Sequence, residues 1–201
     1  MIVIVDYGCG NVASVLNMIG KAGGVAEISG EQEVVRAATK IILPGVGAFD
    51  HGMKQLHAAG LSDVIKERAE SGATVLGICL GMQLLSNGSE EGALPGLGLI
   101  NAHFRRFEPR EGALRVPHMG WNVVHLEKEN KFLISDGGEQ RFYFAHSYHA
   151  VCENPHDILA STHYGTAFPS AYANENIVGM QFHPEKSHRF GLAVMKRFIE
   201  V

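Results

Sequence analysis

The chain has 201 residues, of which 46% are hydrophobic and 19% charged, the ordinary balance of a globular protein with enough apolar material for one sizeable core. Its formal net charge of −4 excludes the strongly basic surface of a typical nucleic-acid-binding protein. No stretch approaches the ~20 apolar residues of a membrane-spanning helix, and the apolar run at residues 2–5 has no basic flank, so we expect a cytoplasmic protein without a membrane segment.

The first half of the chain alternates short apolar runs with amphipathic patterns. We expect strands at residues 2–6, 25–29, 40–45 and 73–78, and helices at residues 11–22, 31–38, 50–59, 62–71 and 80–86. In the helix at 62–71, Ser62 fits an N-cap and Gly72 follows the last turn. Strands separated by helices predict parallel β-α-β units with both sheet faces covered.

The second half has a different pattern. We expect strands joined by short turns, in part antiparallel, in the segments 118–128, 141–151, 157–165 and 167–184, and a closing amphipathic helix at 187–200. There is no internal repeat and no linker. We therefore predict one α/β domain over residues 1–201, with an open, mostly parallel central sheet, flanking helices and additional antiparallel strands.

The cysteines and histidines show no metal-binding spacing. Cys9, Cys79 and Cys152 are odd in number and form no Cys-x-x-Cys pair, so we expect neither a disulfide framework nor a zinc site. His146 and His149 are three residues apart on a predicted strand, which would place them on opposite faces. We predict no metal site.

The first glycine-rich turn, YGCGNVA, raises one functional hypothesis. Gly8, Gly10 and Ala13 fit the G-x-G-x-x-A fingerprint of dinucleotide-binding proteins, and Glu27 on the next strand could bind a ribose. A nucleotide-binding oxidoreductase is therefore an alternative. The fingerprint is weak, since two glycines after a first strand often form only a tight turn.

The second turn, Gly77-Ile78-Cys79-Leu80-Gly81, raises a stronger hypothesis. It is the thiol counterpart of the G-x-S-x-G nucleophile elbow, in which a sharp strand-to-helix turn exposes the nucleophile. The helix that begins near Leu80 would favour a thiolate, and the Leu80 N–H could bind an oxyanion. The alternative is a buried structural cysteine.

A cysteine nucleophile needs a base and a group that orients the base. The segment GMQFHPEKS offers His183 and Glu185, two residues apart and so on one side of an extended segment, with Pro184 holding His183 in extended geometry. The segment Pro44–Gly47 could supply a second oxyanion donor, and its glycines would let a peptide flip. Together these features favour a thiol-dependent enzyme.

The segments PGVGAF, GICLGMQLL, PHMGW and GMQFHPEKS, in this order, resemble the class I (triad) glutamine amidotransferases. Within that family the chain is similar to the HisH-type glutaminase subunits of imidazole glycerol phosphate synthase, over nearly its whole length. The resemblance implies that Cys79 attacks the side-chain amide of L-glutamine, with His183 as general acid and base and Glu185 orienting it. No cofactor and no metal are implied.

The resemblance also implies roles for further residues. The oxyanion hole would comprise Gly45, Val46, Gly47 and Leu80. The contacts to glutamine would come from Gln83, Glu91, Ser147 and Tyr148. A partner (βα)8-barrel cyclase subunit would receive the ammonia, and the partner-facing positions would be Asn11, Pro117, His118, Met119, Trp121 and Lys186. YGCGNVA then becomes an interface loop, and the proline, glycine and polar residues around Trp121 favour an exposed loop over a strand centre.

Two alternatives concern the ammonia acceptor and the substrate. Relatives of this subunit supply ammonia to amidotransferases that modify surface-polysaccharide sugars, and the segments GAFDHGM, SNGSEEG and EKSHRFG resemble that branch. The alternative for the substrate is a cysteine peptidase of similar fold, against which the glutamine-contact positions Gln83 and Glu91 argue.

Overall fold

The computed structural model describes residues 1–108, 115–133 and 138–201. The elements of the first half are β1 (Ile2–Val5), α1 (Val12–Lys21), β2 (Ala26–Ser29), α2 (Gln32–Arg36), β3 (Lys40–Gly45), α3 (Phe49–Ala58), α4 (Leu61–Glu70), β4 (Thr74–Cys79) and α5 (Leu80–Leu85). Those of the second half are β5 (Gly88–Ser89), β6 (Ala102–Arg106), β7 (His118–Leu126), β8 (Gln140–His146), β9 (Tyr148–Cys152), β10 (Ile158–Tyr164), β11 (Thr166–Asn174), β12 (Ile177–Met180) and α6 (His188–Glu200), with 3-10 turns η1 (Pro155–Asp157) and η2 (Pro184–Lys186).

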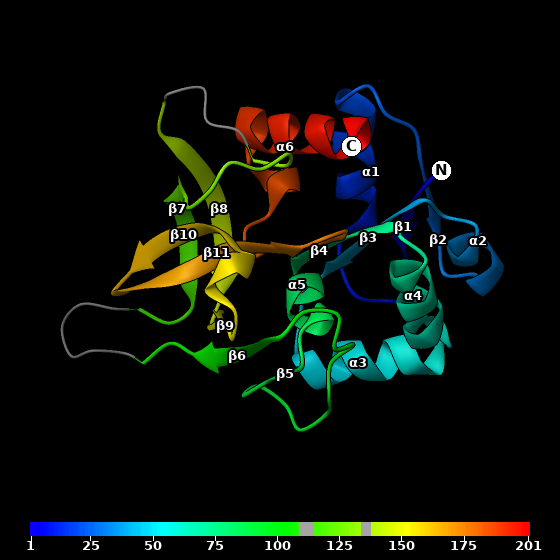
Figure 1. Cartoon of the computed structure of the whole chain (residues 1–201), viewed down its shortest axis with the longest axis horizontal. Helices are drawn as coiled ribbons and strands as arrows, with labels where there is room; N and C mark the ends of the chain where they lie inside the picture. The colour runs from blue at the N-terminus through cyan, green and yellow to red at the C-terminus, as the bar shows by residue number, and fades with distance from the viewer. Residues whose placement is uncertain (109–114, 134–137) are drawn as a thin grey trace.

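The described residues form a nine-stranded sheet in the order β2-β1-β3-β4-β12-β11-β10-β7-β8. The strands from β2 to β12 in this order run parallel, and β11, β10, β7 and β8 continue the sheet antiparallel. Helices α1 and α6 cover one face, and α3, α4 and α5 cover the other (Figure 1). The prediction of an open α/β sheet with antiparallel additions is confirmed.

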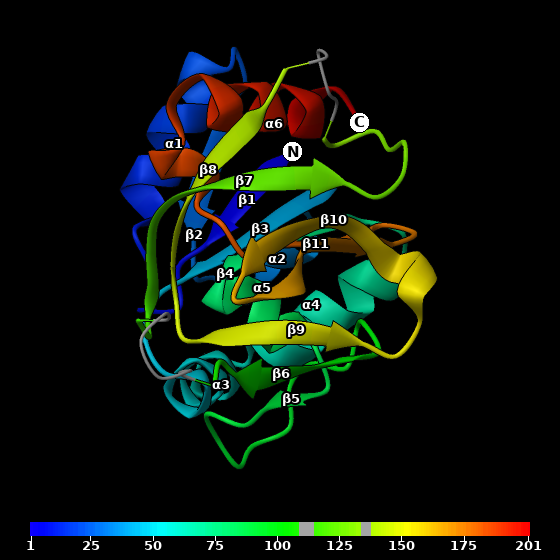
Figure 2. The ribbon, with the colours of Figure 1, turned by 90° about the vertical axis from the view of Figure 1, so that its left-hand side faces the viewer.

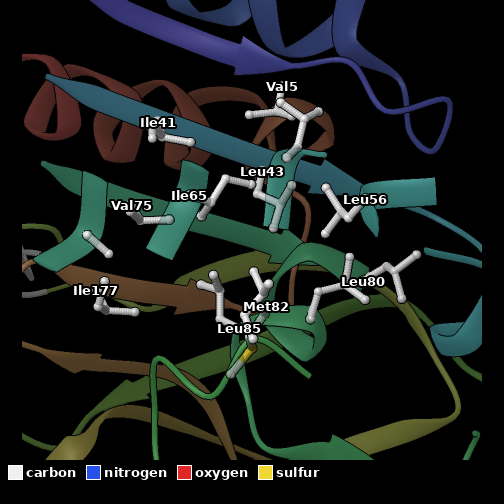
Figure 3. Packing of buried hydrophobic residues seen from close by; sticks show 14 of the residues in the cluster. Val5, Ile41, Leu43, Leu56, Ile65, Val75, Leu80, Met82, Leu85 and Ile177 are labelled. Carbon is white, nitrogen blue, oxygen red and sulfur yellow. The ribbon is translucent and has the colours of Figure 1, made fainter. Parts of the chain in front are cut away.

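The parallel strands are apolar throughout because both of their faces are buried. In β1, Ile2 and Ile4 belong to the core beneath α1 and α6, whereas Val3 and Val5 belong to the core on the opposite face. Figure 3 shows this second core, in which side chains of β3 such as Leu43 pack near Leu80 of α5. Two cores thus hold the central strands, and their carboxyl ends, in fixed positions.

A small sheet, β5-β6-β9, lies on the α3 and α5 side of the large one (Figure 2). The predicted strand at 141–151 is in fact two strands in different sheets, because the chain leaves β8 at His146 and enters β9 at Tyr148. His146 and His149 are therefore not on opposite faces of one strand. Both rings lie against Phe107, with centroid distances of 5.4 and 4.7 Å. Strand β6 was not predicted, since its five residues include His103, Arg105 and Arg106.

The helix ends correct one prediction and confirm another. Ser62 is not the N-cap of α4, because the helix already begins at Leu61 after Gly60, which has a left-handed φ of 66°. The buried Ser62 hydroxyl has no hydrogen-bond partner in the described part of the chain. Gly72 follows the helix with a φ of 88°, as its sequence position predicted. None of the helices within the described ranges is both long and apolar enough to cross a membrane.

Candidate active site

Cys79 sits on a strained turn between β4 and α5. Its φ of 53° and ψ of −105° are unusual for a residue with a side chain, and α5 begins at the next residue. Such a conformation costs ~1–3 kcal/mol and is maintained only where the surrounding structure enforces it, typically at functional sites. The predicted strand-to-helix elbow is therefore present.

The glycines on both sides of Cys79 are required by close backbone packing. A Cβ on Gly81 would lie 1.7 Å from the Leu43 carbonyl oxygen, and one on Gly77 would lie 2.6 Å from the Gly81 carbonyl oxygen. The first turn of α5 therefore packs directly against the backbone of β3 and of β4. This is the physical reason for the G-x-C-x-G pattern.

His183 and Glu185 form a buried pair. The Nδ1 of His183 lies 2.7 Å from Oε1 of Glu185, and both side chains are at least nine-tenths buried. Burial alone would lower the pKa of His183, but hydrogen bonds to Cys79 and to Glu185 outweigh it and raise the pKa to about 9. With Nδ1–H donating to Glu185, Nε2 is left to face the Cys79 thiol.

The predicted pairing of these two side chains holds, but its predicted geometry is wrong in part. His183 is extended (φ −100°, ψ 96°), whereas Glu185 lies in the 3-10 turn η2 rather than on an extended segment. Ser187, which the sequence interpretation missed, secures this turn. Its hydroxyl donates to the His183 carbonyl (2.6 Å) and accepts from the Tyr143 N–H (3.0 Å).

Two further groups next to the sulfur were not predicted. The Cys79 thiol is 3.8 Å from the Ala145 carbonyl oxygen, and Nε2 of Gln181 is 3.9 Å from the sulfur. Gln181 is fully buried, and its Oε1, like that of Gln83, has no partner among the described residues. The only sequence signal for Gln181 was its place two residues before His183.

A cavity of about 370 Å³ opens at the sulfur. Its lining residues are Val46, Gly47, Cys79, Leu80, Gln83, Glu91, Pro117, Met119, Ala145, His146, Ser147, Tyr148, His183 and Lys186. The structure thus brings the predicted nucleophile, base and glutamine contacts to one cavity, together with Val46, Gly47 and Leu80 of the predicted oxyanion hole. Glu185 is paired to His183, and Gly45 is not among the lining residues. A second cavity of about 360 Å³ beside α6 has no cysteine, serine or histidine among its described lining residues.

The predicted oxyanion loop has one fixed end and one open end. Gly45 is the last residue of β3, in register with Cys79. A Cβ on it would lie 2.5 Å from the Tyr7 hydroxyl and 2.9 Å from Cβ of Leu80. Gly47 has a φ of 108° and open space around its Cβ position, and Val46 is 48% exposed. The loop is therefore closely packed at Gly45 and open beside Val46 and Gly47.

Glu91 places a carboxylate on the cavity wall. Its Oε2 accepts a hydrogen bond from the Phe49 N–H, at 3.0 Å. Partial burial raises the pKa of Glu91, the Phe49 hydrogen bond opposes this, and the Asp50 carboxylate adds to it. An ionised carboxylate in this position suits a ligand that carries an ammonium group.

A directional chain of hydrogen bonds joins the cavity wall to β7. Nδ1 of His146 donates to the Tyr148 carbonyl (2.7 Å), so its Nε2 accepts from Nδ1 of His118 (2.9 Å). Nε2 of His118 then accepts from Asn122 (3.2 Å). Burial lowers the pKa of His118 to about 4 and that of His146 to about 3, so both rings are neutral near pH 7.

The predicted partner-facing residues divide into exposed and buried ones. Asn11, Pro117, Met119, Trp121 and Lys186 are exposed. His118 is only 2% exposed and packs between the rings of Phe144 and Tyr164, so its side chain is not available to a partner.

Trp121 corrects a second expectation. It lies in β7, paired with Tyr143 of β8, and not in a loop. Its side chain is nevertheless 44% exposed and stacks on His188, with a centroid distance of 5.5 Å and an interplanar angle of 7°. The outward-facing side of the strand next to the sheet edge therefore carries an exposed tryptophan that the surrounding residue types placed in a loop.

The dinucleotide fingerprint does not form a cofactor site. The space over Gly10 is filled, since a Cβ there would lie 3.2 Å from the Gly45 backbone. Ala13 is exposed, whereas the third position of the fingerprint serves close helix–strand packing. The turn at residues 8–10 packs against β3 and leaves no room for a pyrophosphate.

Comparison with known proteins places these features in a family. The sequence model of the class I glutamine amidotransferases matches residues 3–201. The chain is 50% identical to imidazole glycerol phosphate synthase subunit HisH 2 of Pseudomonas aeruginosa, over 100% of both chains. It is 49% identical to the subunit of the same name in Methanococcus maripaludis, covering 100% of this chain and 99% of the relative.

Solved structures show the same fold at low sequence identity. The Thermotoga maritima PurLQS structure matches with a TM-score of 0.76 and 19% identity, over 99% of this chain and 97% of that one. A crystal structure described as a glutamine amidotransferase matches with a TM-score of 0.71 and 20% identity, over 96% and 98% of the two chains.

Proposed function

The chain belongs to the class I glutamine amidotransferase family, and from this we propose that it is the glutaminase subunit of an imidazole glycerol phosphate synthase. It hydrolyses L-glutamine to glutamate and ammonia, and it passes the ammonia to a (βα)8-barrel cyclase subunit. The observation that carries the proposal is the buried His183–Glu185 pair that faces Cys79 on its strained elbow. We also propose that residues 1–201 form one domain of this family.

The geometry supports a two-step acyl transfer. The Cys79 sulfur attacks the amide carbon of glutamine while its proton is held on Nε2 of His183, as the raised pKa of that ring favours, and the oxyanion binds N–H groups of Leu80 and the Val46–Gly47 segment. His183 then protonates the leaving nitrogen, so that ammonia departs and a γ-glutamyl thioester remains. In the second step His183 removes a proton from water, which attacks the thioester and releases glutamate. Glu185 holds the ring and stabilises its charged form.

The substrate assignment rests on the polar groups of the cavity. Glu91 would bind the α-ammonium group of glutamine, and the Oε1 of buried Gln83, which accepts no hydrogen bond from the described residues, offers a further acceptor. Ser147 and Tyr148 line the same cavity and would supply the remaining contacts. A cysteine peptidase would need an open cleft for a chain on both sides of the scissile bond, whereas this cavity suits a single small molecule.

The triad is tested by substitution and by labelling. Cys79→Ala should abolish glutamate release from glutamine without unfolding the protein, and a glutamine-like electrophile should label Cys79 alone. Because His183 serves both proton transfers, His183→Ala should lower kcat by ~10²–10⁴-fold, whereas Glu185→Gln should cost less. Cys9→Ala and Cys152→Ala are the matched controls and should stay active. Labelling at Cys9 or Cys152, or full activity of Cys79→Ala, would refute the assignment.

A second candidate concerns only the acceptor of the ammonia. The segments that resemble the sugar-modifying branch are GAFDHGM, SNGSEEG and EKSHRFG, which contribute Asp50, Glu91 and Lys186 to or beside the cavity. Titration with a histidine-pathway barrel subunit distinguishes the two candidates. Stimulation of the glutaminase supports the synthase, whereas an active glutaminase that this subunit does not stimulate favours the sugar branch.

We place this reaction in the cytoplasm. Cys9, Cys79 and Cys152 are all free thiols, which suits a reducing compartment. A thiol nucleophile also needs such a compartment to remain reduced.

A further inference from the structure

The interface-loop motif YGCGN contains a buried tyrosine that touches the oxyanion loop. Tyr7 is 4% exposed, and its hydroxyl donates to the Pro44 carbonyl oxygen at 2.8 Å. The hydroxyl also lies so close to Gly45 that a Cβ on this glycine would be only 2.5 Å from the hydroxyl oxygen. Tyr7 therefore contacts both residues of the Pro44–Gly45 peptide.

This peptide is held from three sides. Its strand register sets Gly45 opposite Cys79, and the backbone of Gly10 packs on it so closely that a Cβ there would lie 3.2 Å from Gly45. The hydrogen bond from Tyr7 is the one of these three contacts that a side chain makes. Burial raises the pKa of Tyr7 well above its ordinary value, and the nearby thiols of Cys9 and Cys79 add to this, so the hydroxyl keeps the proton that it donates.

The next peptides are not held in this way. Val46 is 48% exposed and Gly47 has open space around it. The closely packed part of the loop thus ends at Gly45, to whose peptide with Pro44 Tyr7 donates its hydrogen bond, and the open part begins at Val46. An oxyanion donor must be in position before the negative charge develops on the substrate. Because the Pro44–Gly45 peptide is fixed, its orientation sets the position from which the N–H groups of the following residues point toward the substrate.

We propose that Tyr7 is a positioning residue of the oxyanion hole, whose hydroxyl fixes the Pro44–Gly45 peptide so that the following N–H groups can be aimed at the substrate oxyanion. The inference rests on the proposed glutaminase function. It adds to that function a physical connection from the exposed loop around Asn11, four residues away in the same motif, to the site of charge stabilisation.

The test compares Tyr7→Phe with Tyr172→Phe. Tyr172 is the matched control, because it is fully buried and its hydroxyl donates to the carbonyl of Met82 in α5 and not to the loop. In Tyr7→Phe, kcat for glutamine hydrolysis in the complex with the barrel subunit should fall about tenfold, with the KM for glutamine unchanged. Alkylation of Cys79 by iodoacetamide, which uses no oxyanion hole, should keep its rate.

A second measurement does not depend on activity. Hydrogen exchange of the amides at residues 46–48 should be faster in Tyr7→Phe than in the wild type, and unchanged in Tyr172→Phe. Unchanged kcat and exchange in Tyr7→Phe, a parallel fall in alkylation, or the same effects in Tyr172→Phe would overturn the proposal. A wild type that hydrolyses no glutamine would refute the proposed function, and the exchange rates would then decide whether Tyr7 restrains the loop.

Discussion

The Glu91 carboxylate is the clearest single-residue feature for substrate recognition. It lies on the cavity wall, oriented by the Phe49 N–H, and no basic side chain of the described residues forms an ion pair with it. A partly buried charge without a counterion costs free energy that a cationic ligand would recover. The α-ammonium group of glutamine is such a ligand.

This carboxylate predicts a pH dependence of substrate binding. Because burial raises the pKa of Glu91, the group takes up a proton as the pH falls, at a pH above the ordinary value for a glutamate. The KM for glutamine should therefore rise on the acidic side of neutrality in the wild type. Glu91→Gln should show a KM raised at every pH and without this acidic rise, with kcat much less affected. The check is steady-state kinetics from about pH 5 to 8, and an acidic rise of KM that persists in Glu91→Gln would contradict the assignment.

At the scale of elements, the break between β8 and β9 shapes the cavity. The chain changes sheets at Ser147, and the imidazole of His146 spans the break by donating to the Tyr148 carbonyl. The Ser147 carbonyl accepts from the Phe107 N–H at 3.0 Å, which fixes the break from the other side. Ser147 and Tyr148, the proposed glutamine contacts, are thus held by hydrogen bonds from His146 and Phe107 where the regular strand pairing is interrupted.

The buried histidines of this hydrogen-bonded chain predict that the folded protein loses stability in acid. The folded protein holds the pKa of His118 at about 4 and that of His146 at about 3, mainly through burial, below the ordinary value of 6.5. Between pH 6.5 and the lowered pKa of each ring, that histidine binds a proton in the unfolded protein and not in the folded one. Stability that is complete above pH 6.5 is therefore lost as the pH falls, by up to ~1.4 kcal/mol per pH unit for each histidine.

The measurement is denaturant unfolding at several pH values between about 7 and 4.5. His118→Gln removes one of the two groups, so its free energy of unfolding should depend less steeply on pH than that of the wild type. The control is His125→Gln at an exposed position of the same strand, which should retain the wild-type slope. Identical slopes for the wild type and His118→Gln would show that His118 is not held neutral.

At the scale of the whole molecule, the site lies at the carboxyl ends of the parallel strands. Strand β4 ends at Cys79, its neighbour β3 ends at Gly45, and β12 on the other side leads to His183. In open α/β sheets this edge is where ligands bind. The antiparallel strands β7 and β8 extend the same sheet and bring Met119 and Ala145 to the cavity.

The exposed side chains beside the cavity form the surface that we assign to the partner. Met119 is 64% exposed, Trp121 is 44% exposed, and Lys186 lies over the Tyr143 ring with Nζ 5.9 Å from its centroid. Aromatic and methionine side chains are enriched at the centres of protein interfaces. A partner on this surface would cover the mouth of the cavity and receive the ammonia there.

Trp121→Ala should weaken this association more than it weakens the fold. An interface tryptophan commonly contributes ~2 kcal/mol, so the Kd for the barrel subunit should rise about 30-fold, whereas the melting temperature changes little because the side chain is half exposed. The measurement is titration of glutaminase stimulation with a histidine-pathway barrel subunit. Val25→Ala, at an exposed apolar residue before β2, is the control and should bind as the wild type does. A variant that unfolds, or one that is stimulated at wild-type concentrations, would remove Trp121 from the interface.

The sequence by itself determined the parallel core and pointed to the residues of the proposed triad. Strands such as Ile2–Val5 are recognisable because burial on two faces demands an unbroken apolar run. The elbow is recognisable because only glycine fits at positions 77 and 81, where backbone passes within van der Waals contact. His183, Pro184 and Glu185 are adjacent in the chain, so their proximity needed no knowledge of the fold.

Only the tertiary structure decided which distant groups complete the site. Gln181 and Ala145 approach the sulfur, and Tyr7 grips the Pro44 carbonyl, through contacts between residues 37 to 102 positions apart in the chain. The same reason explains the errors. His118 is buried and Trp121 exposed although they are only three positions apart, because the pleat of β7 and the packing on one of its faces decide burial. Local residue types carry no information on which face of a strand another element will cover.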